Sequence, residues 1–397
     1  MHGGRSSVAF LLPTMLPSSR GRRTMRLMMS HRLGPLIFLC GDVMTGRGVD
    51  QILPHRGDPQ LREPVVDDAR VYVSLAEQVN GEVPAPAEFA WPWGEALDIL
   101  DWFAPDVRLI NLETTITAAG EFMRGKAVHY RMHPDNIGCL TAIRPDVCAL
   151  ANNHILDFGT QGLADTLQAL TGAGIRGLGA GLDAERAQRP AMVAVPDGGC
   201  IVISSCGMES SGIPRRWAAG KSQPGVALVP DLSDSSAIAT AERVVAMKRP
   251  GDIAIVSVHW GSNWGYDVEQ RQVDFAHRLI DAGVDIVHGH SSHHPRPIEV
   301  YRGKLILYGC GDTVDDYEGI RVVDVFRHEL RLLYFATIDR NSGYLATLRM
   351  TPMRMRRMRL EQVSSDDAEW LRSKLEHISG RFGTRVETID GVLTVRA

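Results

Sequence analysis

The chain has 397 residues, of which 44% are hydrophobic and 23% are charged. This balance is typical of a globular protein with a sizeable core, and the length suits one large domain or two ordinary ones. The formal net charge of −4 gives no electrostatic reason to expect nucleic acid as a partner. The six cysteines form no Cys-x-x-Cys pair, and most lie in apolar runs, so we interpret them as buried free thiols in a reducing compartment.

The first 34 residues differ from the rest of the chain. They are rich in arginine and hold a short apolar run at residues 8–16 that Pro13 interrupts. This run is well below the roughly 18 residues that span a bilayer, and no convincing small-residue cleavage site follows it. We therefore expect residues 1–34 to be a disordered leader or the product of an early start codon, and the protein to be cytoplasmic without a membrane span.

From residue 35 onward, short apolar runs alternate with segments of helical spacing, which predicts an α/β fold. Continuous apolar runs of this length are typical of buried parallel strands. We expect strands at 36–40, 107–112, 146–151, 175–178, 252–259 and 284–287, hairpins at 191–204 and 298–308, and helices at 162–170, 235–247 and 270–282. The stretch 54–93 has no regular pattern, so we interpret it as a surface insertion near the mouth of a site.

The pattern changes beyond residue 320. We expect antiparallel strands at 330–338, 343–350 and 353–360, a helix at 366–377 and a closing strand pair at 386–395. The Met/Arg alternation of Met353–Arg359 indicates a strand with one apolar and one solvated face rather than a basic binding stripe, with a register slip near Arg356. We divide the chain into the leader 1–34, a main domain 35–320 and a β-rich extension 321–397, which packs on the main domain because its core is small.

Polar side chains follow five of the predicted buried strands. Because loops at the carboxyl ends of strands meet at one crevice of an α/β sheet, we expect these side chains to form one site. Their carboxylate, imidazole and carboxamide groups suit Mn, Fe, Zn or Ni and not a structural thiolate zinc site. Each group alone is a common loop residue, whereas their repeated placement at strand ends favours a metal site. The residues are Asp42, Glu113, Asn153 with His154, His259, and His290 with His293.

These residues also carry a family resemblance, which extends from about residue 36 to about residue 315. The chain resembles the CapA family of poly-γ-glutamate capsule-synthesis proteins, within the calcineurin-like metallophosphoesterase superfamily. The resemblance implies a four-layer αββα sandwich of two mixed sheets. The motifs that carry it are Gly41–Met44 with Gly46 and Arg47, Asn111–Glu113, Ala151–His154 with Asp157, Gly159 and Gly162, His259–Gly261, and Gly289–His293 with Ile298 and Glu299.

The resemblance implies metal ligands position by position. Asp42 would belong to a first metal site and Glu113 would be the bridging carboxylate. The second metal site would be completed by Asn153, His259 and His290, while His293 would reach toward the first. Met44 stands where the superfamily has an imidazole, and a thioether is a poor ligand for hard divalent ions. We therefore expect one tightly bound ion, or a weakly bound pair.

The resemblance implies further roles near the metal. His154 would be the general acid, or would orient a phosphate. Arg47 and Arg131 would hold an anionic group of the substrate in the catalytic site, with a geometry that suits phosphate and carboxylate equally. We expect His294 to contact substrate, and Asp312 to contact substrate or to orient an imidazole. His288 is interpreted as an ordinary strand residue.

Two functions stay open at this point. The first is a metal-dependent hydrolase or transferase in which a metal-activated water attacks a phosphoryl or γ-glutamyl amide group. Its substrate would be an anionic small molecule or a polyglutamate-type polymer. The second is a non-catalytic component of a capsule synthesis or export assembly, which would bind polymer or a partner protein. Neither the substrate nor the oligomeric state follows from the sequence.

Overall fold

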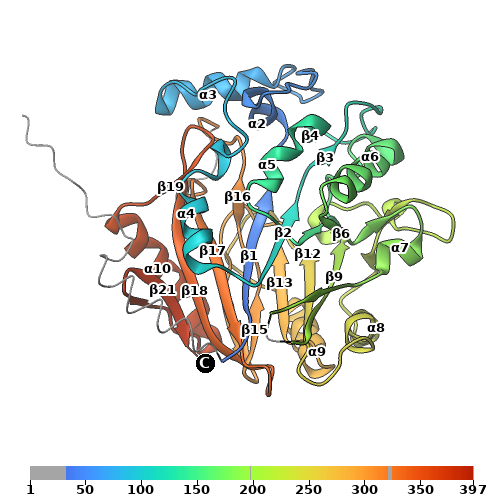
Figure 1. The fold of residues 1–397 in the computed structure, drawn as a ribbon, viewed down its shortest axis with the longest axis vertical. Coiled ribbons are helices and arrows are strands. Elements are labelled where there is room, and N and C mark those ends of the chain that lie inside the picture. Colours follow the sequence, from blue (N-terminus) through green and yellow to red (C-terminus); the bar gives the residue numbers. More distant parts are fainter. Residues whose placement is uncertain (1–32, 197, 321–323, 397) are drawn as a thin grey trace, which may run out of the picture.

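The computed structural model describes residues 33–396 except residues 197 and 321–323, so the predicted leader lies almost wholly outside the described residues. Two mixed sheets form the body of the molecule (Figure 1). In the larger sheet, two short strands lie beside the main strand order: β16 (Asp312–Val314) pairs with β1 (Leu36–Val43), and β19 (Leu360–Gln362) pairs with β18 (Leu345–Met355). The strand order is β20 (Glu387–Ile389), β21 (Val392–Arg396), β18 (Leu345–Met355), β17 (Leu330–Ile338), β1 (Leu36–Val43), β2 (Val107–Leu112), β5 (Val147–Ala149) and β6 (Arg176–Leu178).

The smaller sheet has a parallel centre and an antiparallel strand on either side. One predicted hairpin is formed by β8 (Ala191–Ala194) and β9 (Cys200–Met208), and the other by β14 (Ile298–Tyr301) and β15 (Lys304–Leu307). Both hairpin predictions are confirmed. The strand order is β11 (Leu228–Val229), β9 (Cys200–Met208), β12 (Ile253–His259), β13 (Ile286–His290), β15 (Lys304–Leu307) and β14 (Ile298–Tyr301).

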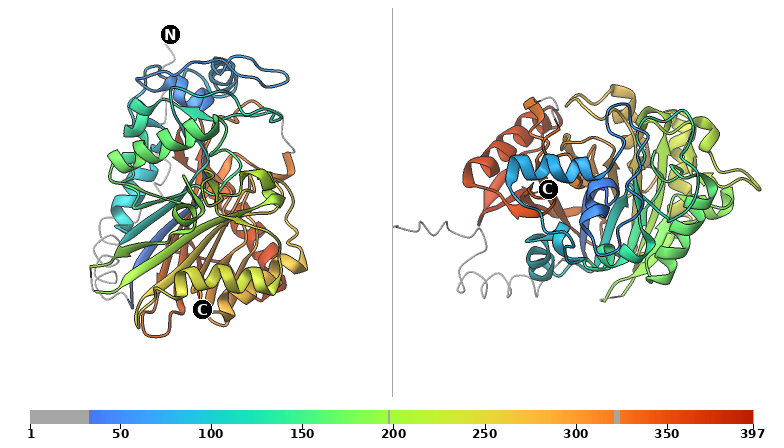
Figure 2. Two further views of the ribbon diagram at one scale, coloured as in Figure 1. Left: turned by 90° about the vertical axis from the view of Figure 1, so that its right-hand side faces the viewer. Right: turned by 90° about the horizontal axis from the view of Figure 1, so that it is seen from above.

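Three apolar clusters account for the packing of these sheets. Successive side chains of a strand point to opposite faces, and β1 places Ile37 and Leu39 against the smaller sheet but Phe38 and Cys40 on the opposite face. The cluster that contains Ile37 and Leu39 joins the two sheets, and the other two attach helices to them. Seen from above in Figure 2, red and green helices lie on opposite sides of the strands. The attached helices include, on the larger sheet, α4 (Ala96–Phe103), α5 (Gly138–Thr141) and α6 (Gly159–Gly172), and on the smaller sheet α8 (Asp234–Val245) and α9 (Gln270–Asp281).

The C-terminal strands belong to the larger sheet. β17 pairs antiparallel with β1, which makes it a neighbour of the strand that carries Asp42. The two strands predicted at 343–350 and 353–360 are wrong, because one strand, β18, runs through Pro352. Proline is tolerated there because β21 pairs only with Thr347–Met350 and β19 only with Met353–Met355. A register slip was predicted near Arg356. The chain instead reverses its direction there, between β18 and β19, and Arg357 and Met358 have positive φ.

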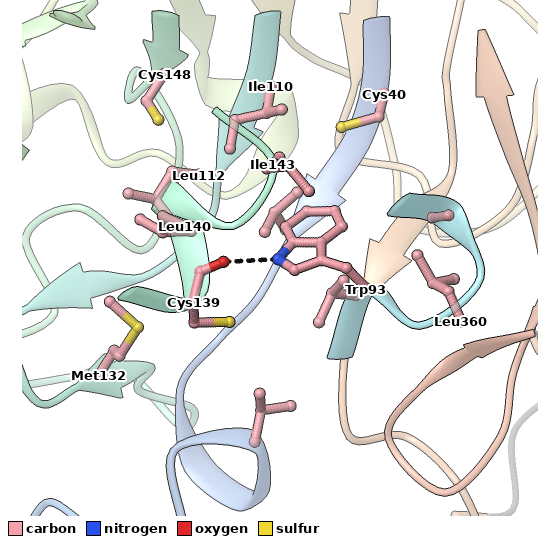
Figure 3. Close-up of a cluster of buried hydrophobic side chains, with 14 of the residues drawn as sticks. Cys40, Trp93, Ile110, Leu112, Met132, Cys139, Leu140, Ile143, Cys148 and Leu360 are labelled. Atoms are coloured by element: carbon pink, nitrogen blue, oxygen red, sulfur yellow. Dashed lines mark hydrogen bonds between the residues drawn. The ribbon is translucent and has the colours of Figure 1, made fainter. Parts of the chain in front are cut away.

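The stretch 54–93 is more regular and more buried than the sequence indicated. It contains α3 (Arg70–Asn80) and ends in a short helix at Trp91–Trp93 that follows the cis peptide bond Ala85–Pro86. Trp93 is fully buried, and its indole nitrogen donates a 2.7 Å hydrogen bond to the carbonyl of Cys139 (Figure 3). The interpretation of this stretch as a surface insertion is therefore wrong at its C-terminal end.

Two other expectations can be compared with the described residues. The six cysteines are free and five of them are buried, as predicted. Within the described chain, none of the helices combines the length and the apolar character that crossing a bilayer requires.

Candidate metal centre

The ends of β1, β2, β12 and β13 bring the predicted side chains of both sheets together. Asp42 on β1 joins the two sheets. One of its carboxylate oxygens accepts a 2.7 Å hydrogen bond from the Asn111 amide on β2, and the other accepts a 3.1 Å bond from the backbone N–H of Ser291, just after β13. His259 and His290 are register partners at the ends of β12 and β13. The convergence expected from parallel strand ends is therefore present.

Three buried carboxylates share a small volume at this junction. One ligand oxygen each from Asp42, Glu113 and Asp312 lies within 4.8 Å of the others. Burial raises the pKa of Asp42 to about 8, and the nearby Asp312 adds to the effect. Burial, together with the charges of Asp42 and Asp312, also raises the pKa of Glu113 well above its usual value. Such a group retains either protons or a cation, because adjacent buried negative charges repel one another.

Two imidazoles complete a second group with Asp42. Its ligand atoms, one each from Asp42, His259 and His290, also lie within 4.8 Å of one another. The two Nδ1 atoms are 2.8 Å apart, so a proton or a cation is needed between them. Burial holds the pKa of both histidines well below the usual value, which leaves neutral imidazoles of the kind that bind metals. Beside them, the side-chain oxygen Oδ1 of Asn153 lies 3.0 Å from His259 Nε2, and a Glu113 carboxylate oxygen lies 3.6 Å from the same nitrogen.

The two candidate ligand groups differ from the ligand set that the resemblance implied. Asp42 is the residue common to both groups, whereas the resemblance implied Glu113 as the bridging carboxylate. Asp312, expected at the substrate, groups with the carboxylates. His293, expected as a ligand, lies outside both groups: its Nδ1 is 3.0 Å from Asp312, and its Nε2 is 2.9 Å from the Asn263 amide. Burial alone would lower the pKa of His293, but the charge of Asp312 outweighs it and raises the pKa.

Met44 lies away from these ligand groups. It is buried in a small apolar cluster with Tyr130 and Tyr317, whose hydroxyls are hydrogen-bonded to each other at 2.7 Å. Met44, which stands where the resemblance led us to look for an imidazole, therefore packs behind the site.

His154 stands beside the metal groups with its own set of partners. Its Nδ1 is 2.6 Å from Asp157, the Lys126 ammonium contacts both residues, and its ring stacks on Tyr130 at 3.8 Å. The other nitrogen, Nε2, is 3.9 Å from a Glu113 oxygen. Burial lowers the pKa of His154 to about 4, although Asp157 opposes that shift. The ring is thus neutral at pH 7, with Nδ1–H donated to Asp157 and a lone pair on Nε2.

Three residues expected to contact substrate have partners within the protein. Arg47 is buried and forms ion pairs with Asp316 and Glu63. Arg131 donates a 3.2 Å hydrogen bond to the backbone carbonyl of Asp58 and lies over the Phe158 ring.

His294 is the third of them. Its Nε2 accepts a 3.1 Å hydrogen bond from the N–H of Gly265, and its Nδ1 is 3.1 Å from the carbonyl of Pro295. Nothing in this geometry supports a substrate contact by Arg47, Arg131 or His294, and those roles stay predictions.

Sequence reasoning missed several side chains that shape the site. Asp157, a motif position to which sequence reasoning assigned no role, lies three residues after His154, and that spacing is a signal that could have paired the two. Asn152 donates to the carbonyl of Leu112 at 2.8 Å and accepts from the N–H of His154 at 3.1 Å, so it fixes the loop. Lys126 and Tyr130 come from a loop without periodicity and give no comparable signal.

Comparisons with known proteins identify the family of the chain. Residues 36–317 match the model of the family described as "Bacterial capsule synthesis protein PGA_cap". A Mycobacterium tuberculosis protein named "Probable polyglutamine synthesis accessory protein" is 62% identical over 353 residues, which cover 89% of this chain and 93% of the relative. The Bacillus subtilis "PGA biosynthesis protein CapA" is 30% identical over 222 residues, which cover 54% of each chain.

Among solved structures, a Thermus thermophilus protein covers 79% of this chain and 97% of its own at 8% identity, with a TM-score of 0.35. A likeness at that level carries no argument about the fold. The match over residues 36–317 and the mycobacterial relative decide the question: the chain belongs to the bacterial capsule synthesis protein PGA_cap family, the CapA family that its strand-end motifs predicted.

Proposed function

We propose that the protein is a metal-dependent hydrolase or transferase that acts in the synthesis of a glutamyl-type polymer. The observation that carries the proposal is the position of Asp42 in two buried ligand groups, one of carboxylates and one of imidazoles. Burying so many charged or polar ligand atoms together costs free energy unless a cation binds them.

The donor set fits a divalent metal. Asp42, Asp312, Glu113, His259 and His290 would hold one or two ions of Mn, Fe, Zn or Ni, with the Asn153 oxygen beside them, because the set mixes carboxylate oxygen and imidazole nitrogen. When bound, such an ion supplies Lewis acidity toward a phosphoryl or carbonyl oxygen.

The chain itself supplies a proton acceptor. His154 presents the lone pair of Nε2 toward Glu113, while Asp157 fixes the tautomer by accepting Nδ1–H. Because burial lowers its pKa to about 4, the ring is neutral at pH 7, and its Nε2 can accept a proton but has none to donate. We therefore assign His154 the role of general base in the first step, where the resemblance implied a general acid.

The names of relatives support the substrate class. The mycobacterial relative is named for polyglutamine synthesis and the Bacillus subtilis relative for PGA biosynthesis. We propose a glutamyl or glutaminyl amide, or a phosphorylated precursor of the polymer, as substrate. The six free cysteines support a reducing compartment, as in cytoplasm.

The finer fold assignment is part of the same proposal. We propose that residues 35–320, together with the C-terminal strands packed on them, form the four-layer αββα sandwich of the metallophosphoesterase superfamily. The three separate apolar clusters support it, since one lies between the sheets and the others lie under helices.

A second function has one observation in its favour. The mycobacterial relative is named an accessory protein, which suits a component that binds polymer or a partner and catalyses nothing. On that alternative, the metal would stabilise the fold at the junction of the two sheets, and its removal would weaken binding without abolishing any turnover.

The two functions are separated by metal content and turnover. Purified protein is analysed by plasma mass spectrometry, then assayed with and without chelator on a phosphodiester, a phosphomonoester and a γ-glutamyl anilide. We expect Mn or Zn to be bound, and His259→Ala and His290→Ala to lose both metal and activity. His377→Ala, an exposed histidine on α10 (Ser365–Ser379), is the matched control. Unchanged metal content and turnover in both site variants would exclude the enzyme.

A further inference from the structure

A line of hydrogen bonds runs behind His290, away from the ligand groups. It begins at the backbone carbonyl of Cys40 on β1, which lies 2.8 Å from His288 Nε2. His288 Nδ1 is 3.1 Å from the Ser257 hydroxyl, and that hydroxyl is 2.9 Å from His290 Nε2. All four residues are buried, and Ser257 and His288 are register partners on β12 and β13.

The direction of each bond follows from its chemistry. A backbone carbonyl only accepts, so His288 Nε2 carries a proton. The ring is fully buried and faces a carbonyl and a hydroxyl rather than a carboxylate, so it is neutral and its Nδ1 has a lone pair. Ser257 has one hydroxyl proton and donates it to that lone pair. Its oxygen is then left to accept a proton from His290 Nε2.

We propose that Ser257 and His288 are positioning residues that hold His290 as its Nε2–H tautomer and so direct the Nδ1 lone pair to a divalent metal. That lone pair faces His259 Nδ1 at 2.8 Å and an Asp42 oxygen at 3.8 Å. The metal half of this inference rests on the proposed function. The tautomer half does not, since it follows from the hydrogen bonds among Cys40, His288 and Ser257, and it leaves His259 to carry the proton between the two Nδ1 atoms in the metal-free protein.

This line of hydrogen bonds also connects the imidazole group of the site to the strand that carries Asp42. Cys40 precedes Asp42 by two residues on β1, in the larger sheet, whereas Ser257, His288 and His290 belong to the smaller sheet. A shift of one sheet against the other would therefore change both the position of Asp42 and the orientation of His290. Partners that orient a ligating histidine typically change metal affinity by about 10- to 100-fold when they are removed.

The tautomer can be measured in the unmodified, metal-free protein. Histidine nitrogens are labelled with ¹⁵N, and long-range ¹H–¹⁵N spectra are recorded at pH 7.5, with His290 assigned by comparison with the His290→Gln protein. We expect a protonated Nε2 and an unprotonated Nδ1 at His290. A protonated Nδ1 with an unprotonated Nε2 would overturn the inference.

The effect on metal affinity is measured by titration calorimetry with Mn²⁺ and Zn²⁺. Ser257→Ala and His288→Phe are expected to weaken binding by about 10- to 100-fold, and Ser257→Thr, which keeps the hydroxyl, to recover most of it. The matched control is Ser205→Ala: Ser205 lies opposite Ser257 in the β9–β12 register, and its buried hydroxyl has no hydrogen-bond partner among the described residues. Equal affinities in Ser257→Ala and Ser205→Ala would overturn the positioning role.

The two proposals fail in different ways. Unmodified protein that binds neither Mn²⁺ nor Zn²⁺ contradicts the proposed function, whereas the tautomer of His290 in metal-free protein still decides this inference. If His288→Phe does not fold, Ser257→Ala and the spectrum of the unmodified protein still decide it.

Discussion

At the scale of single residues, His154 shows how neighbours give an ordinary side chain its chemistry. Asp157 accepts the proton of Nδ1, Tyr130 stacks on the ring, and burial keeps the ring neutral. Lys126 offsets the charge of Asp157 in this buried place, since the two form an ion pair. The nitrogen that we propose as the proton acceptor, Nε2, lies 3.9 Å from a Glu113 oxygen.

Replacing either member of the His154–Asp157 pair is expected to lower turnover while metal stays bound. His154→Gln removes the proton acceptor, and a loss of about 10²- to 10⁴-fold in kcat is expected. Asp157→Asn replaces the acceptor of Nδ1–H by an amide that can turn its N–H toward the ring, so the ring would protonate at Nε2. Metal content, measured on the same samples, should equal that of the unmodified protein, because neither residue belongs to the ligand groups. A parallel loss of metal and kcat would contradict the assignment.

Trp93 tests whether the irregular stretch 54–93 belongs to the core. Its side chain is fully buried and hydrogen-bonded to the Cys139 carbonyl. Trp93→Ala is expected to lower the free energy of unfolding by about 3–5 kcal/mol, the usual cost of removing a large buried aromatic side chain. Urea denaturation measures it, with Val65→Ala as the exposed control, expected within about 0.5 kcal/mol of the unmodified protein. A cost under about 1 kcal/mol would place this stretch outside the core.

At the scale of elements, long buried strands and amphipathic helices were predictable, whereas other helices were missed. The strands at Val107–Leu112 and Leu330–Ile338 have the predicted bounds, because continuous apolar runs of this length reflect burial on both faces. The helices Arg70–Asn80 and Ala96–Phe103 were not predicted. The first has a mixed apolar and polar sequence inside an irregular stretch, and the second is a single short run in which packing against the sheet, not periodicity, decides the conformation.

The candidate site was predictable in its members more than in their roles. Residues at strand ends are placed by the sheet, so Asp42, His259 and His290 could be found from the sequence. Which carboxylate lies between two groups depends on distances across two sheets, and no sequence pattern encodes them. The same holds for His293, whose Nδ1 contacts Asp312 and which lies outside both candidate ligand groups.

The position of β17 leads to a prediction about truncation. β17 lies between β1 and β18, so a chain that ends at residue 320 leaves β1 without its antiparallel neighbour. We expect the fragment 33–320 to lack a cooperative thermal transition by circular dichroism. The fragment 33–385, which loses only β20 and β21 at the sheet edge, should fold with lower stability. A cooperative, metal-binding fragment 33–320 would instead support residues 321–397 as a separable extension.

At the scale of the whole molecule, the site is a junction between two sheets. Asp42 accepts hydrogen bonds from β2 of one sheet and from the loop after β13 of the other, and the Cys40–His288 bond crosses between the sheets nearby. An ion held by Asp42, His259 and His290 would have ligands from both sheets. Because it binds the folded chain, it is expected to stabilise the fold by about 2.7 kcal/mol at 100 times its Kd.

The same junction sets the pH dependence of the metal-free protein. Asp42 and Glu113 have raised pKa values in the folded state, so the folded chain binds more protons than the unfolded chain above about pH 4. Their contribution to stability is present below the unfolded pKa and is lost as the pH rises through the folded value, about 8 for Asp42. His293, whose pKa is also raised, acts in the same direction. Histidines with lowered pKa values act in the opposite direction up to about pH 7.5, because unfolded rings are half protonated at about pH 6.5 and lose the last of their protons about one pH unit higher. These are His154, His259, His288, His290, His294 and His328.

The free energy of unfolding of chelated protein is therefore expected to fall between pH 7.5 and 8.5, by up to about 1.4 kcal/mol per pH unit for each group that is protonated in the folded chain but not in the unfolded chain. Thermal melts across this range measure it. Mn²⁺ or Zn²⁺ should raise the melting temperature more at pH 8 than at pH 6.5, because at pH 8 fewer protons have to leave the carboxylates before the ion binds. Asp42→Asn, which removes one titrating group, should flatten the fall. A stability that stays level or rises over this range in chelated protein would contradict the presence of protonated carboxyl groups at the junction.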